Sequence, residues 1–276
     1  MTGTLYIVAT PIGNLEDITL RALRVLHEVE WIACEDTRQT RKLLEHFGIT
    51  KPLVSYHEHN ETGRAAELVE KLAGGGSGAL VSDAGTPLVS DPGYRLVHGA
   101  IAAGIRVVPI PGPSAAVGAL SAAGLPTNAF RFCGFLPPRS SQRRKMLEQL
   151  KAETGTLIFY ETPHRILEAL EDVAVVMGPR PVVMARELTK LHEEFLRGTA
   201  AEIREDLAAR AAVKGEITLL IGKAGMVQMD DTPIEDAVRV AEQHGLPRMD
   251  AIKHVARQRG LSKREVYRLI AGEGGR

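Results

Sequence analysis

The sequence predicts an α/β protein of two lobes followed by a small helical extension. Short runs rich in β-branched residues alternate with amphipathic stretches from residue 4 onward, a pattern typical of parallel strands joined by crossover helices. The rhythm changes near residue 124, and only helical patterns follow residue 224. We therefore expect an α/β domain at 1–124, a second α/β domain at 125–224, and a basic helical extension at 225–276.

The first domain is predicted to contain a doubly wound, mainly parallel sheet. Its strands are expected at 4–9, 31–35, 52–56, 78–83 and 105–110, and its helices at 18–29, 37–47, 61–73 and 92–103. Asp91 before Pro92 predicts an N-cap with proline at the first helical position. Such sheets bind ligands beyond the carboxyl ends of their strands, so the loops after the first, fourth and fifth strands are the candidate site.

The strands and helices of the second domain and of the extension are predicted from the same kinds of sequence pattern. Strands are expected at 130–135, 156–161, 181–187, 193–199 and 215–222, and helices near 140–152, 164–177 and 200–211. In the extension, Thr232 and Pro233 begin one helix and a second starts near 248. Ser262 with Glu265 predicts a capping box that opens a third helix.

The composition is that of an ordinary folded protein. Of 276 residues, 44% are hydrophobic, and 34 basic side chains balance 34 acidic ones, which argues against a uniformly basic nucleic-acid binder. Two cysteines are too few for a disulfide framework or a Cys-built zinc site, and no leader peptide is apparent. The uncharged stretch 107–130 contains four prolines, so it cannot cross a membrane as one helix. We expect a cytoplasmic protein that uses neither a membrane nor a metal.

Three segments rich in glycine or other small residues are candidates for ligand-binding loops. GGGSG (74–78) follows a helix and precedes a strand, which favours a flexible connection over a phosphate-binding loop. SDAGTPLVSDPG (82–93) is longer than a turn needs, and Gly85 permits close approach of a ligand. Asp83 is either a turn residue or a carboxylate that faces the ligand. PGPSA (111–115) opens a small-residue helix that packs closely on a sheet, on a flat ligand, or on both.

Charged segments suggest contacts with an anionic partner. Residues 35–38 place two carboxylates and an arginine at a strand end, and an acidic helix start explains only one carboxylate. The run at 139–145 is basic, and residues 248–268 hold seven basic side chains against two acids. This tail resembles a helix-turn-helix, and a basic helical unit binds phosphates readily. A packing or dimerisation tail is the alternative.

Eight segments, taken in order, resemble the tetrapyrrole-methylase-like class (class III) of S-adenosylmethionine methyltransferases. They are TPIGNLEDIT, ACEDTRQTRKLL, VSDAGTPLVSDPGY, PIPGPSA, FCGFLPPR, FYETPHR, ARELTK and GEITLLIG. The likeness spans residues 4–222 and is greatest to the branch that methylates a cytidine of small-subunit ribosomal RNA. It implies two α/β domains with S-adenosylmethionine in the cleft between them, within a homodimer, and 2′-O-methylation of a cytidine ribose in the decoding region of 16S rRNA.

The resemblance also implies residues for the cofactor. They lie at or near the ends of the predicted strands of both domains: Pro11, Ala84, Gly85, Thr86, Val89, Ser114, Ala115, Tyr160, Glu161, Arg186, Glu187, Gly215, Glu216 and Ile217.

Catalysis needs a group that takes or stabilises the charge of a ribose hydroxyl. Candidates are Glu35, Asp36, Arg38 and Asp83, with Asp17 behind them. RNA binding is expected from exposed cations: Arg38, Arg41, Lys42, Arg139, Arg143, Arg144, Lys145, Lys253, Arg257, Lys263, Arg264 and Arg268. One alternative is a methyltransferase of the same fold that acts on a tetrapyrrole or another small molecule. A third hypothesis is a nucleic-acid-binding protein without activity.

Overall fold

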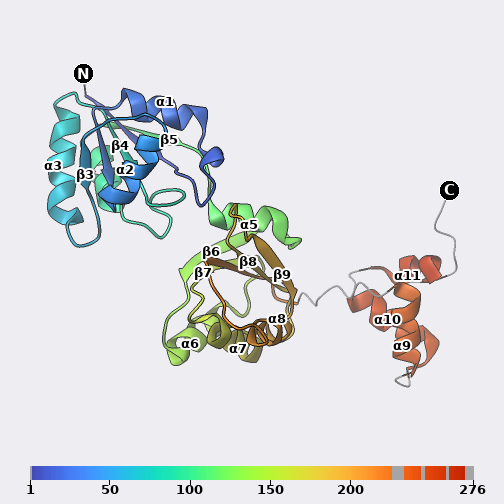
Figure 1. The fold of residues 1–276 in the computed structure, drawn as a ribbon. Helices are drawn as coiled ribbons and strands as arrows, with labels where there is room; N and C mark the ends of the chain where they lie inside the picture. The colour runs from blue at the N-terminus through green and yellow to red at the C-terminus, as the bar shows by residue number, and fades with distance from the viewer. Residues whose placement is uncertain (1, 226–232, 244–245, 259–260, 271–276) are drawn as a thin grey trace.

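A computed structural model describes residues 2–225, 233–243, 246–258 and 261–270. Its main body consists of two lobes, each built on a five-stranded sheet (Figure 1). The strands and helices expected from the sequence form, with ends shifted by a few residues. No helix within the described ranges is long and apolar enough to cross a membrane.

The first sheet is wholly parallel. Its strands are β1 (Thr4–Val8), β2 (Trp31–Cys34), β3 (Leu53–Ser55), β4 (Gly78–Val81) and β5 (Arg106–Ile110), in the order β3-β2-β4-β1-β5. Each neighbouring pair runs in the same direction. The carboxyl ends of β1, β4 and β5 therefore meet at one edge, which confirms the doubly wound arrangement and brings the three candidate loops together.

Helices cover both faces of this sheet. One face carries α1 (Leu20–Glu28) and α2 (Thr37–His46), after the short 3-10 helix η1 (Leu15–Asp17), and the other carries α3 (Glu61–Ala73) and α4 (Tyr94–Ala102). Thr19 begins α1 as its N-cap, because its hydroxyl accepts a hydrogen bond from the Ala22 amide at 3.0 Å. Residues 74–77 connect α3 to β4, as the sequence predicts for GGGSG.

The second sheet is mixed. Its strands are β6 (Phe130–Phe135), β7 (Thr156–Glu161), β8 (Val182–Arg186), β9 (Glu194–Gly198) and β10 (Ile217–Ile221), in the order β6-β7-β10-β8-β9. Only β6 and β7 are parallel. One face packs against α6 (Ser140–Leu150), α7 (Ile166–Met177) and α8 (Ala200–Ala208).

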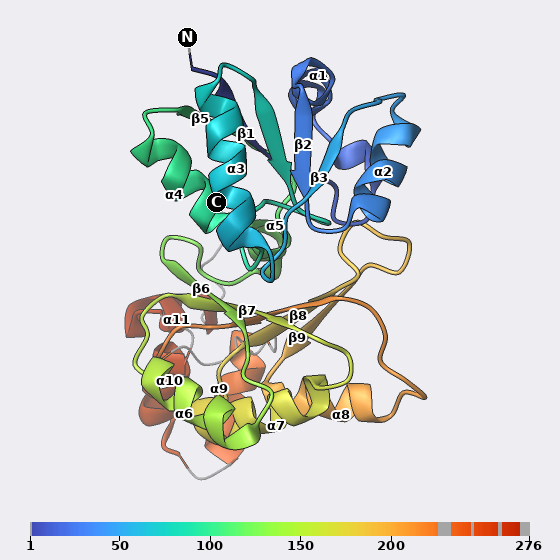
Figure 2. The same ribbon diagram turned by 90° about the vertical axis from the view of Figure 1, so that its left-hand side faces the viewer.

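The other face of the second sheet is covered by α5 (Ala115–Ala123), which follows the last strand of the first sheet. Ala116, Ala119 and Leu120 of α5 form one buried cluster with Ile158 and Leu220 of the second sheet. Figure 2 shows α5 between the two sheets. The small residues of this helix therefore serve close packing, and the helix joins the two lobes.

The extension forms three helices that pack on one another: α9 (Ile234–Gln243), α10 (Arg248–Gln258) and α11 (Lys263–Ile270). The predicted capping box is confirmed, since Ser262 and Glu265 exchange hydrogen bonds of 2.7 and 3.2 Å. The expected helix start at Thr232 lies outside the described residues. The three domain ranges stay predictions, because α5 precedes residue 124 in the chain and yet packs on the second sheet.

Candidate active site

Three loops of the first lobe are fastened to one another at the carboxyl edge of its sheet. Thr10 and Gly85 exchange backbone hydrogen bonds of 2.9 and 3.0 Å. The Thr86 hydroxyl donates to the Pro113 carbonyl at 3.0 Å, and the Thr10 hydroxyl donates to the Ser82 carbonyl at 3.1 Å. The loops after β1, β4 and β5 therefore form one continuous wall held by neutral hydrogen bonds.

The loop at 82–93 has an unusual backbone. Gly85 (φ 84°) and Gly93 (φ 143°) adopt positive φ, and so do Leu88 (φ 71°) and Ser90 (φ 68°), which costs a non-glycine residue about 1–3 kcal/mol. The expectation that Asp91 caps α4 is wrong: the cap position belongs to Gly93, and the helix begins at Tyr94. The left-handed turns at Ser90 and Gly93 move Asp91 away from the helix start and onto the wall of a cavity.

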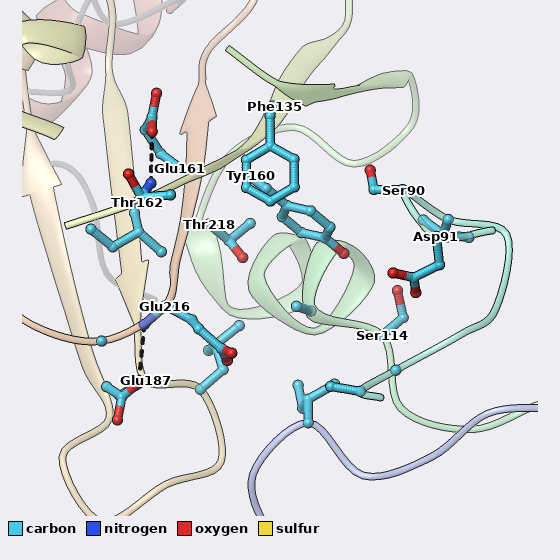
Figure 3. Close-up of a pocket in the computed structure, with 18 of the residues that line it drawn as sticks. Ser90, Asp91, Ser114, Phe135, Tyr160, Glu161, Thr162, Glu187, Glu216 and Thr218 are labelled. Carbon is cyan, nitrogen blue, oxygen red and sulfur yellow. Dashed lines mark hydrogen bonds between the residues drawn. The ribbon is translucent and has the colours of Figure 1, made fainter. Parts of the chain in front are cut away.

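The second lobe supplies the opposite wall from the ends of β7 and β8 and the start of β10. The Glu187 carboxylate accepts a hydrogen bond from the Glu216 amide at 3.0 Å (Figure 3) and from the Lys190 ammonium at 2.9 Å. Lys190 also donates to Glu216 at 3.0 Å. A Cβ added at Gly215 (φ 91°) would lie 2.3 Å from the Glu187 Cγ, so only glycine fits beneath this ion-pair cluster.

The two walls enclose a cavity of about 610 Å³, which we call the first cavity. Of the residues predicted to bind the cofactor, all except Pro11 and Arg186 line it. Pro11 lies on a neighbouring cavity, and Arg186 instead pairs with Glu194 at 3.0 Å. Further lining residues that the sequence analysis missed are Ile12, Ser90, Asp91, Phe135, Thr162, Pro163, Leu188, Lys190 and Thr218.

Two titratable groups in the first cavity are perturbed by burial. Burial, then the charge of Glu35, raises the pKa of Asp91 to about 6, against the effect of a hydrogen bond from Ser82. Burial also raises the pKa of Tyr160, so the phenol stays protonated. Figure 3 shows the Tyr160 hydroxyl pointing toward the side of the cavity where Asp91 and Ser114 lie.

Glu161 is a buried carboxylate on the wall of the first cavity, with 3% of its surface exposed. Its Oε2 atom accepts hydrogen bonds from the Thr162 amide at 2.6 Å and from Arg165 at 3.1 Å. Its Oε1 atom has no hydrogen-bond partner in the described part of the chain. A buried acceptor without a donor is costly, so this atom would gain from a ligand that carries a hydroxyl or amino group.

A second cavity, of about 740 Å³, adjoins the first and shares Ile12, Ala84, Lys190 and Glu216 with it. Its remaining lining residues come from the loop after β1, from α2 and from the end of β4: Pro11, Gly13, Leu15, Gln39, Thr40, Lys42, Leu43, His46, Ser82 and Asp83.

The four candidates for catalysis lie at the edge of the first sheet, but only Asp83 lines one of these two cavities. Asp83 accepts a hydrogen bond from the Asp36 amide at 3.0 Å. Asp36 is the N-cap of α2 and binds the Arg38 side chain at 2.8 Å. Burial raises the pKa of Glu35, with smaller contributions from the charges of Asp83 and Glu58.

Most of the cations predicted to bind RNA are exposed. Arg41, Lys42, Arg139, Lys145, Lys253, Lys263, Arg264 and Arg268 are exposed, as is Arg38, whereas the side chain of Arg257 lies outside the described residues. Arg143 is a correction: it is fully buried, and its Nε donates to Asp172 at 2.6 Å. Arg144 is half-exposed and also binds Asp172, at 2.5 Å. Arg143 therefore belongs to the core and cannot contact RNA directly.

Comparison with known proteins shows which family this chain belongs to. The model of the tetrapyrrole (corrin/porphyrin) methylases matches residues 4–204. "Ribosomal RNA small subunit methyltransferase I" of Halalkalibacterium halodurans is 51% identical over 98% of this chain and 96% of its own length. The protein of the same name from Escherichia coli O157:H7 is 49% identical over 99% and 96%.

Solved structures share the fold at lower identity. The methyltransferase CobJ has a TM-score of 0.61 at 20% identity and covers 83% of this chain and 98% of its own. A uroporphyrin-III C-methyltransferase from Thermus thermophilus, complexed with S-adenyl homocysteine, has a TM-score of 0.55 at 17% identity over 80% and 97%. The chain belongs to the tetrapyrrole methylase family and, within it, to the family of ribosomal RNA small subunit methyltransferase I. The fold class and the family indicated by the sequence are thereby confirmed.

Proposed function

We propose that this chain transfers the methyl group of S-adenosylmethionine to the 2′-hydroxyl of a cytidine in the decoding region of 16S rRNA. The observation that carries the proposal is the first cavity. Residues at the ends of five separate strands, which the resemblance predicts to bind the cofactor, meet on its walls. The full-length relatives named for small-subunit ribosomal RNA support the substrate.

The first cavity suits S-adenosylmethionine in size and in chemistry. Its volume, about 610 Å³, falls within the usual range for ligand pockets. Asp91, as a carboxylate, would attract an ammonium group, and the unpaired Oε1 of Glu161 would accept from a hydroxyl or amino group. When bound, the cofactor supplies a methyl group on a positively charged sulfur. The chain's residues hold it and exclude water, and alignment alone can provide much of the rate.

Among the catalytic candidates, the proposal assigns the direct role to Asp83. Its position on the second cavity, beside Ala84, supports contact with a substrate at the junction of the cavities. Asp36 and Arg38 would act by ordering the start of α2, since Asp36 caps this helix and holds Arg38. Glu35 would add negative charge, which favours a cationic donor nearby.

The proposed RNA contacts are the exposed cations of α2, of α6 and of the extension. Arg139 lies at the start of α6 and Lys145 within it, both exposed, and Lys263, Arg264 and Arg268 lie along α11. Basic side chains on a compact helical unit bind phosphates by releasing counterions. The proposal includes action in the cytoplasm, a homodimer, and recognition of the RNA within the small ribosomal subunit.

The test is transfer of labelled methyl groups from S-adenosylmethionine. The chain is incubated with unmethylated small subunits, with free 16S rRNA or with uroporphyrinogen, and the RNA is digested to nucleosides. The proposal expects label in 2′-O-methylcytidine. Label only in the porphyrinogen would instead support the small-molecule alternative, and RNA binding without any transfer would support a protein that has no activity.

A further inference from the structure

The second cavity is the feature of the described chain that the cofactor does not explain. Its volume is about 740 Å³, and it shares four residues with the first cavity. A molecule bound there would touch a molecule bound in the first cavity, because Ile12, Ala84, Lys190 and Glu216 lie on the boundary. Two adjoining cavities of this size suit a reaction between two bound molecules.

One face of α2 forms the outer wall of this cavity. Gln39, Lys42, Leu43 and His46 recur at spacings of three and four residues and so lie along one side of the helix. Lys42 and His46 are exposed, Leu43 is half-buried, and the Gln39 amide is accessible. This wall therefore offers the Lys42 ammonium and a ring N–H of His46 for a phosphate at its rim. It also offers an amide that can pair with the edge of a base, and an apolar surface against which the base can rest.

Lys190 crosses from the second lobe to the boundary between the cavities. Its side chain lies so close to Gly13 that a Cβ there would be 2.4 Å from the Lys190 Cγ. Beside it, the Thr189 hydroxyl accepts a hydrogen bond from the Asn14 amide at 3.1 Å. The contacts of Lys190 with Glu187 and Glu216 use two of its three N–H donors. The third N–H can donate to an oxygen atom of a ligand at the boundary. The two carboxylates offset the positive charge of Lys190, so the cluster does not repel a cation bound nearby.

We propose that the second cavity binds the target ribonucleotide of a single-stranded RNA segment, with its phosphate at Lys42 and His46 and its ribose at Lys190. This inference rests on the proposed function, because the first cavity must hold the methyl donor. In the reaction, the ribose 2′-oxygen bonds to the methyl carbon while the carbon–sulfur bond breaks. The bonding pair returns to sulfur, which becomes neutral, and the hydroxyl proton passes to the Asp83 carboxylate on the wall of the same cavity.

The inference is tested by filling the second cavity from α2. Leu43→Trp adds bulk on the cavity side, and Glu45→Trp is the matched control, because residue 45 lies about 200° further round the helix and is exposed. Affinity for S-adenosylhomocysteine is measured by calorimetry, and methyl transfer to RNA is measured as above. We expect Leu43→Trp to bind S-adenosylhomocysteine as the wild type does and to transfer methyl groups about 100-fold more slowly, while Glu45→Trp matches the wild type in both.

A second variant guards against misfolding of Leu43→Trp. Replacing both Lys42 and His46 by alanine changes only exposed side chains. It should raise the Kd for RNA and reduce the slope of log Kd against log salt by about 1 for the lost phosphate contact. Full transfer by Leu43→Trp, or an unchanged salt slope in the double variant, would overturn the inference. A wild-type chain that binds S-adenosylhomocysteine but methylates no RNA would overturn the proposed function itself.

Discussion

In the described part of the first lobe the buried polar side chains are hydroxyls, whereas the second lobe buries whole charges. Thr10 and Ser82 lie beneath the loops of the first lobe and bond to nearby carbonyls. The second lobe buries Arg143 with Asp172, and Glu161 beside Arg165. The difference extends to the first cavity, since hydrogen bonds fix one wall and ion pairs fix the other.

This contrast predicts how each wall responds to change. Removing a neutral hydrogen bond lowers the free energy of unfolding by about 1 kcal/mol, and salt changes this loss little. Removing one partner of a buried ion pair lowers the free energy of unfolding much more, because the other charge stays uncompensated. A partly exposed ion pair weakens as salt rises.

Asp172→Ala should have the largest effect on stability. Arg143 is completely buried and Asp172 is 2% exposed. The substitution leaves the buried guanidinium with a more distant and exposed carboxylate, that of Glu168 at 3.7 Å, and should lower the free energy of unfolding by about 3–5 kcal/mol. Glu148→Ala, which removes an exposed partner of Lys151 on the same helix, should cost less than about 1 kcal/mol. Urea denaturation measures both, and equal losses would show that the second lobe does not depend on its buried charges.

Gly215→Ala should disturb the ion-paired wall of the first cavity. The new Cβ would meet the Glu187 side chain, and φ of 91° disfavours any residue but glycine. We expect affinity for S-adenosylhomocysteine to fall by about 10-fold or more. Gly48→Ala is the control: it has a similar positive φ of 66° but nothing within 4 Å of the added atom. The account fails here if both variants bind S-adenosylhomocysteine equally well.

The pH dependence of binding should report Asp91. Its pKa is raised to about 6, so the side chain is neutral below that pH and a carboxylate above it. Affinity for S-adenosylhomocysteine should therefore rise as pH increases through about 6, and Asp91→Asn should flatten the profile. Without ligand the sign is opposite, because burial disfavours the charged form. Asp91→Asn should therefore stabilise the folded protein at pH 8 but not at pH 4.

Thr86→Val should have the smallest effect. It removes the hydrogen bond to the Pro113 carbonyl and should lower the free energy of unfolding by about 1 kcal/mol. Its effect on affinity for S-adenosylhomocysteine should be the same at low and high salt. The effect of Lys190→Gln on the opposite wall should shrink as salt rises, since Lys190 is partly exposed. Calorimetry at two salt concentrations separates the two, and equal salt dependence would remove the proposed difference between the walls.

Much of the fold could be predicted from local patterns, because β-branched runs and amphipathic periods are local properties. Asp91 is a residue for which the local sequence pattern predicts the wrong structure. The Asp-Pro pair is typical of a helix start, but positive φ at Ser90 and Gly93 overrides it, and no local rule predicts left-handed backbone at a serine. The packing of α5 on the second sheet could not be predicted either, since the sequence does not say which sheet a helix covers.

The burial of Arg143, which contradicts the predicted RNA contact, has a signal in the sequence. Residues 143, 147 and 150 share one helical face, and Leu147 and Leu150 are buried there with it. The neighbouring basic residues instead predict a position at the surface. Lys190, by contrast, became a candidate only from structure, because it lies at the boundary of two cavities formed by both lobes.

Titration of the folded wild-type chain with S-adenosylhomocysteine in a calorimeter tests whether the cavity between the lobes holds the methyl donor. We expect saturable binding, one molecule per chain, that is weakened in Gly215→Ala and retained in Gly48→Ala. Absence of any binding heat at several temperatures, from a chain that circular dichroism shows to be folded, would contradict it.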